Sequence, residues 1–204
     1  LPPNTPICYI GYFAQVSGNK QGVHRTEAGH YIGEGSTFTL KIRAVRPVRS
    51  ELWARLEEAV KAFVWVGALG LRATRGFGRL AEPKHLPTAQ AFRDWAKTLR
   101  TSGIFLYEGR PGDLPPHAFL AEQLKSLRRA CDLRPNDPRA RALGAATKEQ
   151  DSDRQASALR LCPVRTADAG TLPFFLYTDN ACEAASVKTR VDAFCQASSA
   201  FTAL

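Results

Sequence analysis

Glycine and arginine alternate between Gly67 and Leu80, in the sequence GALGLRATRGFGRL. Glycine lets the backbone adopt positive φ angles and lets another chain approach closely. Backbone N–H groups exposed in such a loop can form an anion-binding concavity, and the planar guanidinium group of arginine matches the oxygens of a phosphate. The segment therefore predicts a loop that binds the phosphates of a polyanion. Its four glycines and three arginines are Gly67, Gly70, Gly76, Gly78, Arg72, Arg75 and Arg79.

Two well-known nucleotide motifs do not fit this loop. A dinucleotide-binding fingerprint needs G-x-G-x-x-G between a strand and a helix, and a P-loop ends in Gly-Lys-Ser/Thr. Here the loop follows a predicted helix, and Gly78 is followed by Arg79 and Leu80. Mononucleotide binding is therefore disfavoured. A second interpretation stays open, in which the glycines make a tight connection from a helix to a strand, with Gly67 as the helix cap and solvated arginines.

The charge balance favours an acidic partner. Lysine and arginine total 28 against 19 aspartate and glutamate residues, which gives a formal net charge of +9. Nucleic acid is the commonest partner of such a protein, although many soluble proteins are simply basic.

The elements that position the loop are predicted from periodicity. In residues 37–43, apolar and polar side chains alternate, which predicts a half-buried strand with Lys41 and Arg43 on its outer face. Ser50 is placed to cap a helix, with Glu51 in its first turn. Apolar residues then recur every three or four positions, so we expect the helix to pack one face inward. They are Leu52, Leu56, Ala59, Phe63 and Val66.

Three regions follow from the pattern. Residues 1–86 contain an apolar strand at 7–15 and the strand, helix, glycine loop and short strand of half a ferredoxin-like unit. Residues 87–154 are predicted to be a helical insertion with two amphipathic helices, whose arginines are either solvated or a second contact patch. Residues 155–204 are predicted to return to the sheet, with a hairpin turning at 168–170 and a final helix.

The loop also resembles a known family. Residues 70–80 resemble the glycine-rich loop of the RAMP superfamily of CRISPR-Cas proteins, and most closely that of the first subunit of the type III-B (Cmr) effector complex. Residues 9–12 and 32–40 resemble the aromatic strand and the I-x-x-G-S-x-F-x-L segment of that family. Residues 159–164 are similar to a later strand, with Cys162 as a departure before Pro163.

The resemblance implies an α+β, ferredoxin-like (RRM-like) RAMP domain with a glycine-rich loop and a helical insertion. It implies a non-catalytic RNA-binding subunit of a type III CRISPR-Cas effector complex that serves antiviral defence. Guide or target RNA would be held through its backbone phosphates, and other Cas subunits would be the protein partners. The expected RNA-binding residues are Gly70, Arg72, Arg75, Gly76, Gly78, Arg79, Lys41, Arg43 and His30.

Two other functions stay open. A metal-independent CRISPR RNA-processing endoribonuclease would need a histidine with a second acid or base, and His24 and His30 share one glycine-rich segment. A scaffold would use the loop to pack against a neighbouring subunit. Five cysteines without a C-x-x-C pair favour neither disulfides nor zinc, and we expect no cofactor.

The chain contains no methionine, so we expect it to be part of a longer protein with a preceding domain. It shows neither a signal-peptide pattern nor an apolar run of about 18 residues, so we expect a cytoplasmic, prokaryotic protein that makes no membrane contact.

Overall fold

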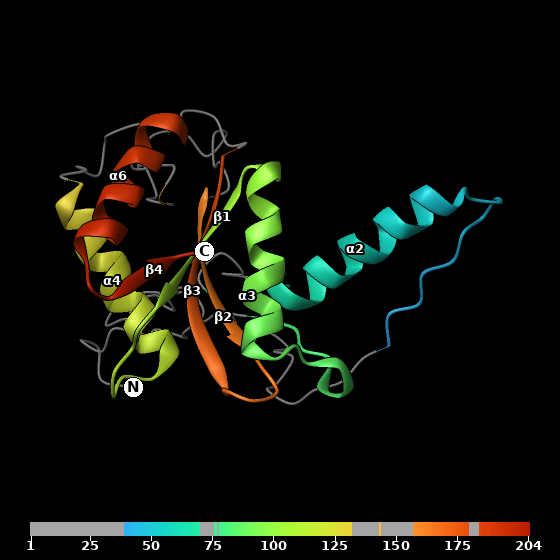
Figure 1. Ribbon diagram of the computed structural model, residues 1–204, viewed down its shortest axis with the longest axis horizontal. Coiled ribbons are helices and arrows are strands. Elements are labelled where there is room, and N and C mark those ends of the chain that lie inside the picture. Colours follow the sequence, from blue (N-terminus) through green and yellow to red (C-terminus); the bar gives the residue numbers. More distant parts are fainter. Residues whose placement is uncertain (1–38, 70–75, 77, 132–142, 144–156, 180–183) are drawn as a thin grey trace, which may run out of the picture.

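The computed structural model describes residues 39–69, 76, 78–131, 143, 157–179 and 184–204 (Figure 1). Its centre is a sheet in the order β2-β3-β1-β4, in which every neighbouring pair of strands is antiparallel. The strands are β1 (Ile104–Gly109), β2 (Leu159–Arg165), β3 (Thr171–Thr178) and β4 (Phe201–Ala203). The helices are α2 (Ser50–Val66), α3 (Ala89–Thr98), α4 (Pro116–Ala130) and α6 (Ala184–Ala197), with short 3₁₀ turns at Pro83–His85 and Leu99–Ser102.

The order of elements from β1 onward is β1-α4-β2-β3-α6-β4. Helix α4 lies between β1 and β2 in the sequence, and β3 separates these two strands in the sheet. Helix α6 lies between β3 and β4, and β1 separates that pair. This arrangement makes the chain an α+β protein and is compatible with a ferredoxin-like fold.

Alternation along the strands divides the core between the two faces of the sheet. In β1, Phe105 and Tyr107 face α4 and α6, whereas Ile104 and Leu106 face α3. Figure 1 shows α4 and α6 covering one face while α3 covers the other. The core on the α3 side is largely aromatic, with ring centroids 5.0–6.1 Å apart among Trp65, Phe92, Trp95 and Phe174.

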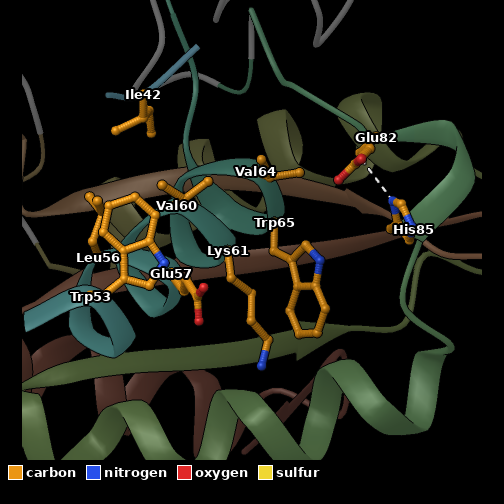
Figure 2. Close-up of a pocket in the computed structure, with 10 residues that line it drawn as sticks. All are labelled: Ile42, Trp53, Leu56, Glu57, Val60, Lys61, Val64, Trp65, Glu82 and His85. Atoms are coloured by element: carbon orange, nitrogen blue, oxygen red, sulfur yellow. Dashed lines mark hydrogen bonds and ion pairs between the residues drawn. The ribbon is translucent and has the colours of Figure 1, made fainter. Parts of the chain in front are cut away.

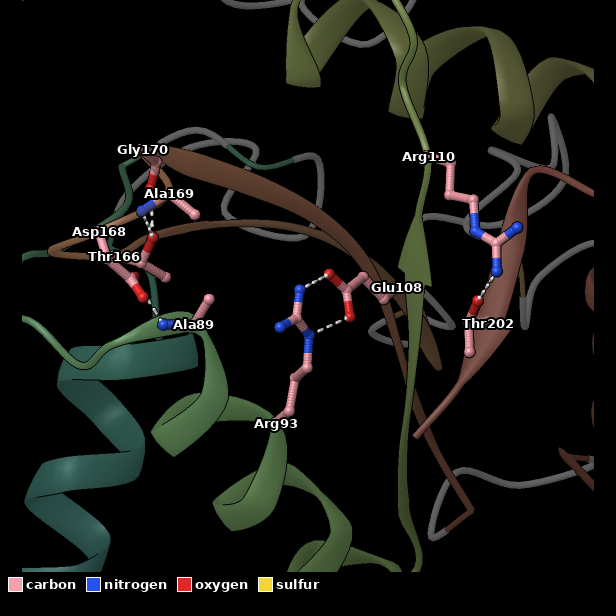
Figure 3. Close-up of polar contacts among 9 residues, drawn as sticks. All are labelled: Ala89, Arg93, Glu108, Arg110, Thr166, Asp168, Ala169, Gly170 and Thr202. Atoms are coloured by element: carbon pink, nitrogen blue, oxygen red, sulfur yellow. Dashed lines mark hydrogen bonds and ion pairs between the residues drawn. The ribbon is translucent and has the colours of Figure 1, made fainter.

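Polar contacts fix α3 on the sheet (Figure 3). Arg93 donates two hydrogen bonds of 2.7 Å to the carboxylate of Glu108 on β1, which is a bidentate ion pair. At the amino end of the helix, the Thr88 hydroxyl accepts from Ala91 N at 3.2 Å, and the Asp168 carboxylate accepts from Ala89 N at 2.8 Å. The turn between β2 and β3 therefore caps a helix that lies far from it in the sequence.

The prediction of a helical insertion at 87–154 is wrong. Both predicted helices exist, as α3 and α4, but β1 lies between them and pairs with β3 and β4 in the interior of the sheet. Residues 104–109 thus supply a central strand of the main sheet. The predicted hairpin at 168–170 is confirmed by the pairing of β2 with β3.

The prediction of a half-buried strand at 37–43 is also wrong for its described part. Residues 39–43 are exposed and form no strand, and Leu40 and Ile42 are 54% and 45% exposed. The sheet that is compatible with a ferredoxin-like fold is therefore not built from this segment with α2, but from β1, β2, β3 and β4. At the start of α2, Arg49 rather than Ser50 is the cap residue, and its side chain makes no capping hydrogen bond.

Among the described residues, no helix combines the length and the apolar character needed to cross a membrane.

Replacing Gly109 with alanine tests the packing of β1 on α4. A Cβ atom at this position would lie 2.2 Å from Cε1 of Phe119. Because the core is close-packed, we expect Gly109→Ala to lower the free energy of unfolding by about 1–3 kcal/mol, measured by urea denaturation. Phe119→Leu removes the clashing ring atoms, so the same substitution should cost clearly less in that background. Equal costs in both backgrounds would contradict the packing argument.

Alkaline pH tests the burial of Cys195. Burial, aided by the Asp192 carboxylate, raises the pKa of this thiol from 9.0 to about 12. Because the unfolded thiol ionises first, the stabilising contribution is complete below pH 9 and is lost as the pH rises toward 12. Each such group lowers the free energy of unfolding by up to about 1.4 kcal/mol per pH unit. Urea denaturation between pH 8 and 10 should show a shallower decline for Cys195→Ala; parallel declines would rule this contribution out.

Candidate nucleic-acid interface

The glycine loop begins where α2 ends. Gly67 is the carboxyl-terminal cap, as predicted, and its N–H donates to the Phe63 carbonyl at 2.9 Å. The chain then makes a bridge between Ala68 and Arg79, and the Leu69 N–H donates to the Gly78 carbonyl at 2.9 Å. Both stems of the loop are therefore held together at its base.

Glycine is required at two positions near the end of the loop. Gly76 and Gly78 have φ angles of +84° and +65°, in the left-handed region that favours glycine. A Cβ atom on Gly78 would lie 1.8 Å from the Leu69 carbonyl oxygen, and one on Gly76 would lie 3.1 Å from Cδ of Pro163. The loop thus meets the Leu69 backbone at Gly78, where a side chain would clash, and passes close to the Pro163 ring at Gly76, where the positive φ angle favours glycine.

Arg79 holds the loop to the body of the protein. Its Nη1 donates to the Gly67 carbonyl at 2.6 Å, its Nη2 to the Trp65 carbonyl at 2.5 Å and its Nε to the Pro163 carbonyl at 3.1 Å. Carbonyls at the end of a helix lack intrahelical partners, and a cation there also complements the helix dipole. Arg79 therefore joins the end of α2 to β2, with three of its five N–H groups donating inward. A phosphate contact by this residue stays a prediction.

Lys41 and Arg43 lie in a basic segment whose residues are all exposed. We call residues 41–49 the basic arm; it contains four cations and no acidic residue, and it leads directly into α2. Sequence reasoning identified Lys41 and Arg43 but missed Arg46 and Arg49, because it followed the alternation only as far as residue 43. The signal that was available is a cation at every second or third position, in a stretch without a carboxylate: Lys41, Arg43, Arg46 and Arg49.

Several predicted site residues lie outside the described residues. They are Gly70, Arg72, Arg75, His24 and His30. The structure consequently brings together only Gly76, Gly78 and Arg79 at the loop, with the basic arm at the opposite end of α2.

The sheet itself does not offer an open face to RNA in the described part of the chain. Single-strand readers of the RRM type stack bases on aromatic side chains of an uncovered sheet face. Here Tyr107 on the central strand is 3% exposed, and its hydroxyl donates to the Asp192 carboxylate, which also accepts from Lys188 at 2.6 Å. Burial and this carboxylate raise the pKa of the Tyr107 phenol, so it stays protonated. Among the described residues, the loop and the arm are therefore the surfaces left for the predicted RNA contact.

The described histidines, cysteines and carboxylates do not assemble a metal site. No group of three or more such residues is close enough to hold an ion among residues 39–69, 76, 78–131, 143, 157–179 and 184–204. His85 contacts Glu82 at 2.7 Å, and His117 Nε2 lies 3.3 Å from the Gly76 carbonyl oxygen. Cys131, Cys162 and Cys195 are buried and free of disulfide bonds.

No protein-family model, curated protein or solved structure matches this chain.

Substituting lysine for Arg79 tests whether the three hydrogen bonds of the guanidinium group, rather than its positive charge, stabilise the protein. Lysine keeps the positive charge but cannot donate to three divergent carbonyls. We expect Arg79→Lys to lower the free energy of unfolding by about 1–3 kcal/mol, because carbonyls at the end of α2 lose their donor. Arg55→Lys, at an exposed position on the same helix, is the matched control and should change stability little. Urea denaturation measures both; an Arg79→Lys variant as stable as the control would refute the structural role.

Proposed function

We propose that this chain is a non-catalytic RNA-binding subunit, or part of one, of a type III CRISPR-Cas effector complex. The observation that carries the RNA-binding part is the basic arm, with four exposed cations in nine residues and no carboxylate among them. Lysine and arginine side chains in this state bind a polyanion with little desolvation cost. RNA is the polyanion that the net charge of +9 and the glycine loop both favour.

The mechanism is contact with the phosphate backbone. Cations of the arm displace counterions from the RNA, and the N–H groups of the glycine loop add further donors. Such contacts fix the position of the strand but carry no sequence information. Sequence recognition is then left to base pairing by the guide RNA, and other Cas subunits complete the path of the strand.

The assignment to a CRISPR effector rests on the resemblance of residues 70–80 to the RAMP loop. The positive φ angles of Gly76 and Gly78 support it, because they give a physical reason for glycine at two positions of that pattern. The four-stranded α+β topology is compatible with a RAMP domain. No contact of a described residue favours the endoribonuclease alternative.

Replacing the four cations of the arm tests the proposal. The variant Lys41→Gln/Arg43→Gln/Arg46→Gln/Arg49→Gln removes four positive charges without touching a described hydrogen bond of the core. We expect weaker binding of labelled single-stranded RNA, and a slope of log affinity against log salt that is less steep by up to about 2.8, or about 0.7 per lost contact. Fluorescence anisotropy between 50 and 400 mM salt is the measurement.

A control variant with the same charge change separates a local interface from general attraction. Lys84, Lys125, Arg129 and Arg165 are exposed cations outside the arm, and their replacement by glutamine should leave most of the binding intact. Equal binding by the two variants would refute the arm as the interface. A gel of the RNA after incubation completes the test, since cleavage by the unmodified protein would replace the proposal with the endoribonuclease.

A further inference from the structure

Helix α2 carries an apolar face that the described segments cover only at its carboxyl end, where Trp65 and Val66 pack against the core. None of its residues is buried, although it contains Leu52 and Trp53, which are 47% and 39% exposed. Figure 1 shows the helix projecting from the body of the molecule, with only its carboxyl end against the sheet. Monomeric proteins rarely leave a contiguous apolar surface of this kind uncovered without a partner for it.

A groove runs along this face. Its volume is about 430 Å³. Figure 2 shows the apolar side chains of the helix along one side and Ile42 across from them. The apolar lining consists of Ile42, Trp53, Leu56, Val60, Val64 and Trp65. The charged lining is mixed, because Glu57, Lys61, Glu82 and His85 contribute both signs.

We propose that residues 7–15 of the same chain, ICYIGYFAQ, dock in this groove. The segment is apolar and aromatic, and residues 1–19 contain no charged side chain, which matches a lining whose interior is aliphatic and aromatic. Burial of such side chains against α2 removes apolar surface from water on both partners. The occupant is therefore a part of this chain rather than a separate protein.

The lengths agree with this assignment. Nine extended residues span about 30 Å, and α2 with its 17 residues is about 25 Å long. The described chain begins at residue 39, close to Ile42 in the groove wall, and residues 16–38 connect it to the segment. A connection of this length reaches up to about 75 Å when extended, which is enough for residues 7–15 to reach every part of the helix.

Two other occupants are less suited to the groove. A nucleic-acid strand would bring its phosphates to a lining that includes the carboxylates of Glu57 and Glu82. A second copy of the chain would have to compete with a tethered segment, whose effective concentration is on the order of millimolar. The docking uses the apolar lining, whereas RNA binding uses the exposed cations of the basic arm, so the proposal is independent of the proposed function.

Protection of an engineered thiol tests the docking. In a background of Cys8→Ala and Cys182→Ala, the remaining cysteines, Cys131, Cys162 and Cys195, are buried. Leu56→Cys then places one reactive thiol in the groove, and Arg55→Cys places one on the exposed side of the same helix. The rate of reaction with a methanethiosulfonate reagent is measured in the full chain and in a chain whose residues Ile7, Tyr9, Ile10, Tyr12 and Phe13 are replaced by serine.

We expect the serine substitutions to accelerate the reaction of Leu56→Cys by at least about tenfold, which corresponds to a docking free energy of about 1.4 kcal/mol. The Arg55→Cys rate should stay the same, which also shows that the helix is intact. Equal Leu56→Cys rates with and without the substitutions would overturn the proposal. Protection that grows with protein concentration would assign the groove to a second copy, and protection that requires added RNA would assign it to nucleic acid; either result also overturns it.

Discussion

Three backbone carbonyls converge on the guanidinium group of Arg79, and the position of the glycine loop depends on this contact. Two of the carbonyls belong to the end of α2 and the third to β2, so a single side chain connects a helix, a loop and a sheet. The geometry also explains the glycine spacing. Arg79 can reach these carbonyls only if the chain turns sharply before it, and Gly78, with its positive φ angle, makes that turn.

The covered sheet determines which surfaces remain for recognition. In many single-strand readers the sheet is the binding platform, but here α3 lies on one face and α4 and α6 lie on the other. The bidentate pair between Arg93 and Glu108 holds α3 in place over the central strand. Under the proposed function, recognition would therefore use the periphery, where the basic arm leads into one end of α2 and the glycine loop begins at the other.

The sequence predicted secondary structure correctly where an element depends on residues that are close together in the chain. The periodicity of α3 and α4 predicted two amphipathic helices, and the turn around Asp168 predicted a hairpin, because each depends on neighbouring residues. Residues 104–109 were missed as a strand because a run of four apolar and aromatic residues between two helices resembles the end of a helix. Only their long-range pairing with β3 and β4 distinguishes the two possibilities.

In the candidate site, too, local features could be predicted from the sequence and long-range contacts could not. The glycines at 76 and 78 were found because positive φ angles leave a residue-type signal, whereas the contacts of Arg79 depend on Pro163, which is far away in the sequence. Alternation at 37–43 predicted a strand that has no described partner. Strand formation needs a neighbour to pair with, and alternation alone does not supply one.

The pairing of β1 also has a consequence for synthesis of the chain. This strand leaves the ribosome long before its partners, since β3 ends at Thr178 and β4 at Ala203. At a translation rate of about 5–20 residues per second, both edges of β1 wait several seconds for a partner. An unpaired apolar strand is prone to associate with other chains. Pairing of β1 is thus complete only after the last strands of the sheet have been synthesised, and until then its backbone donors and acceptors stay open to other partners.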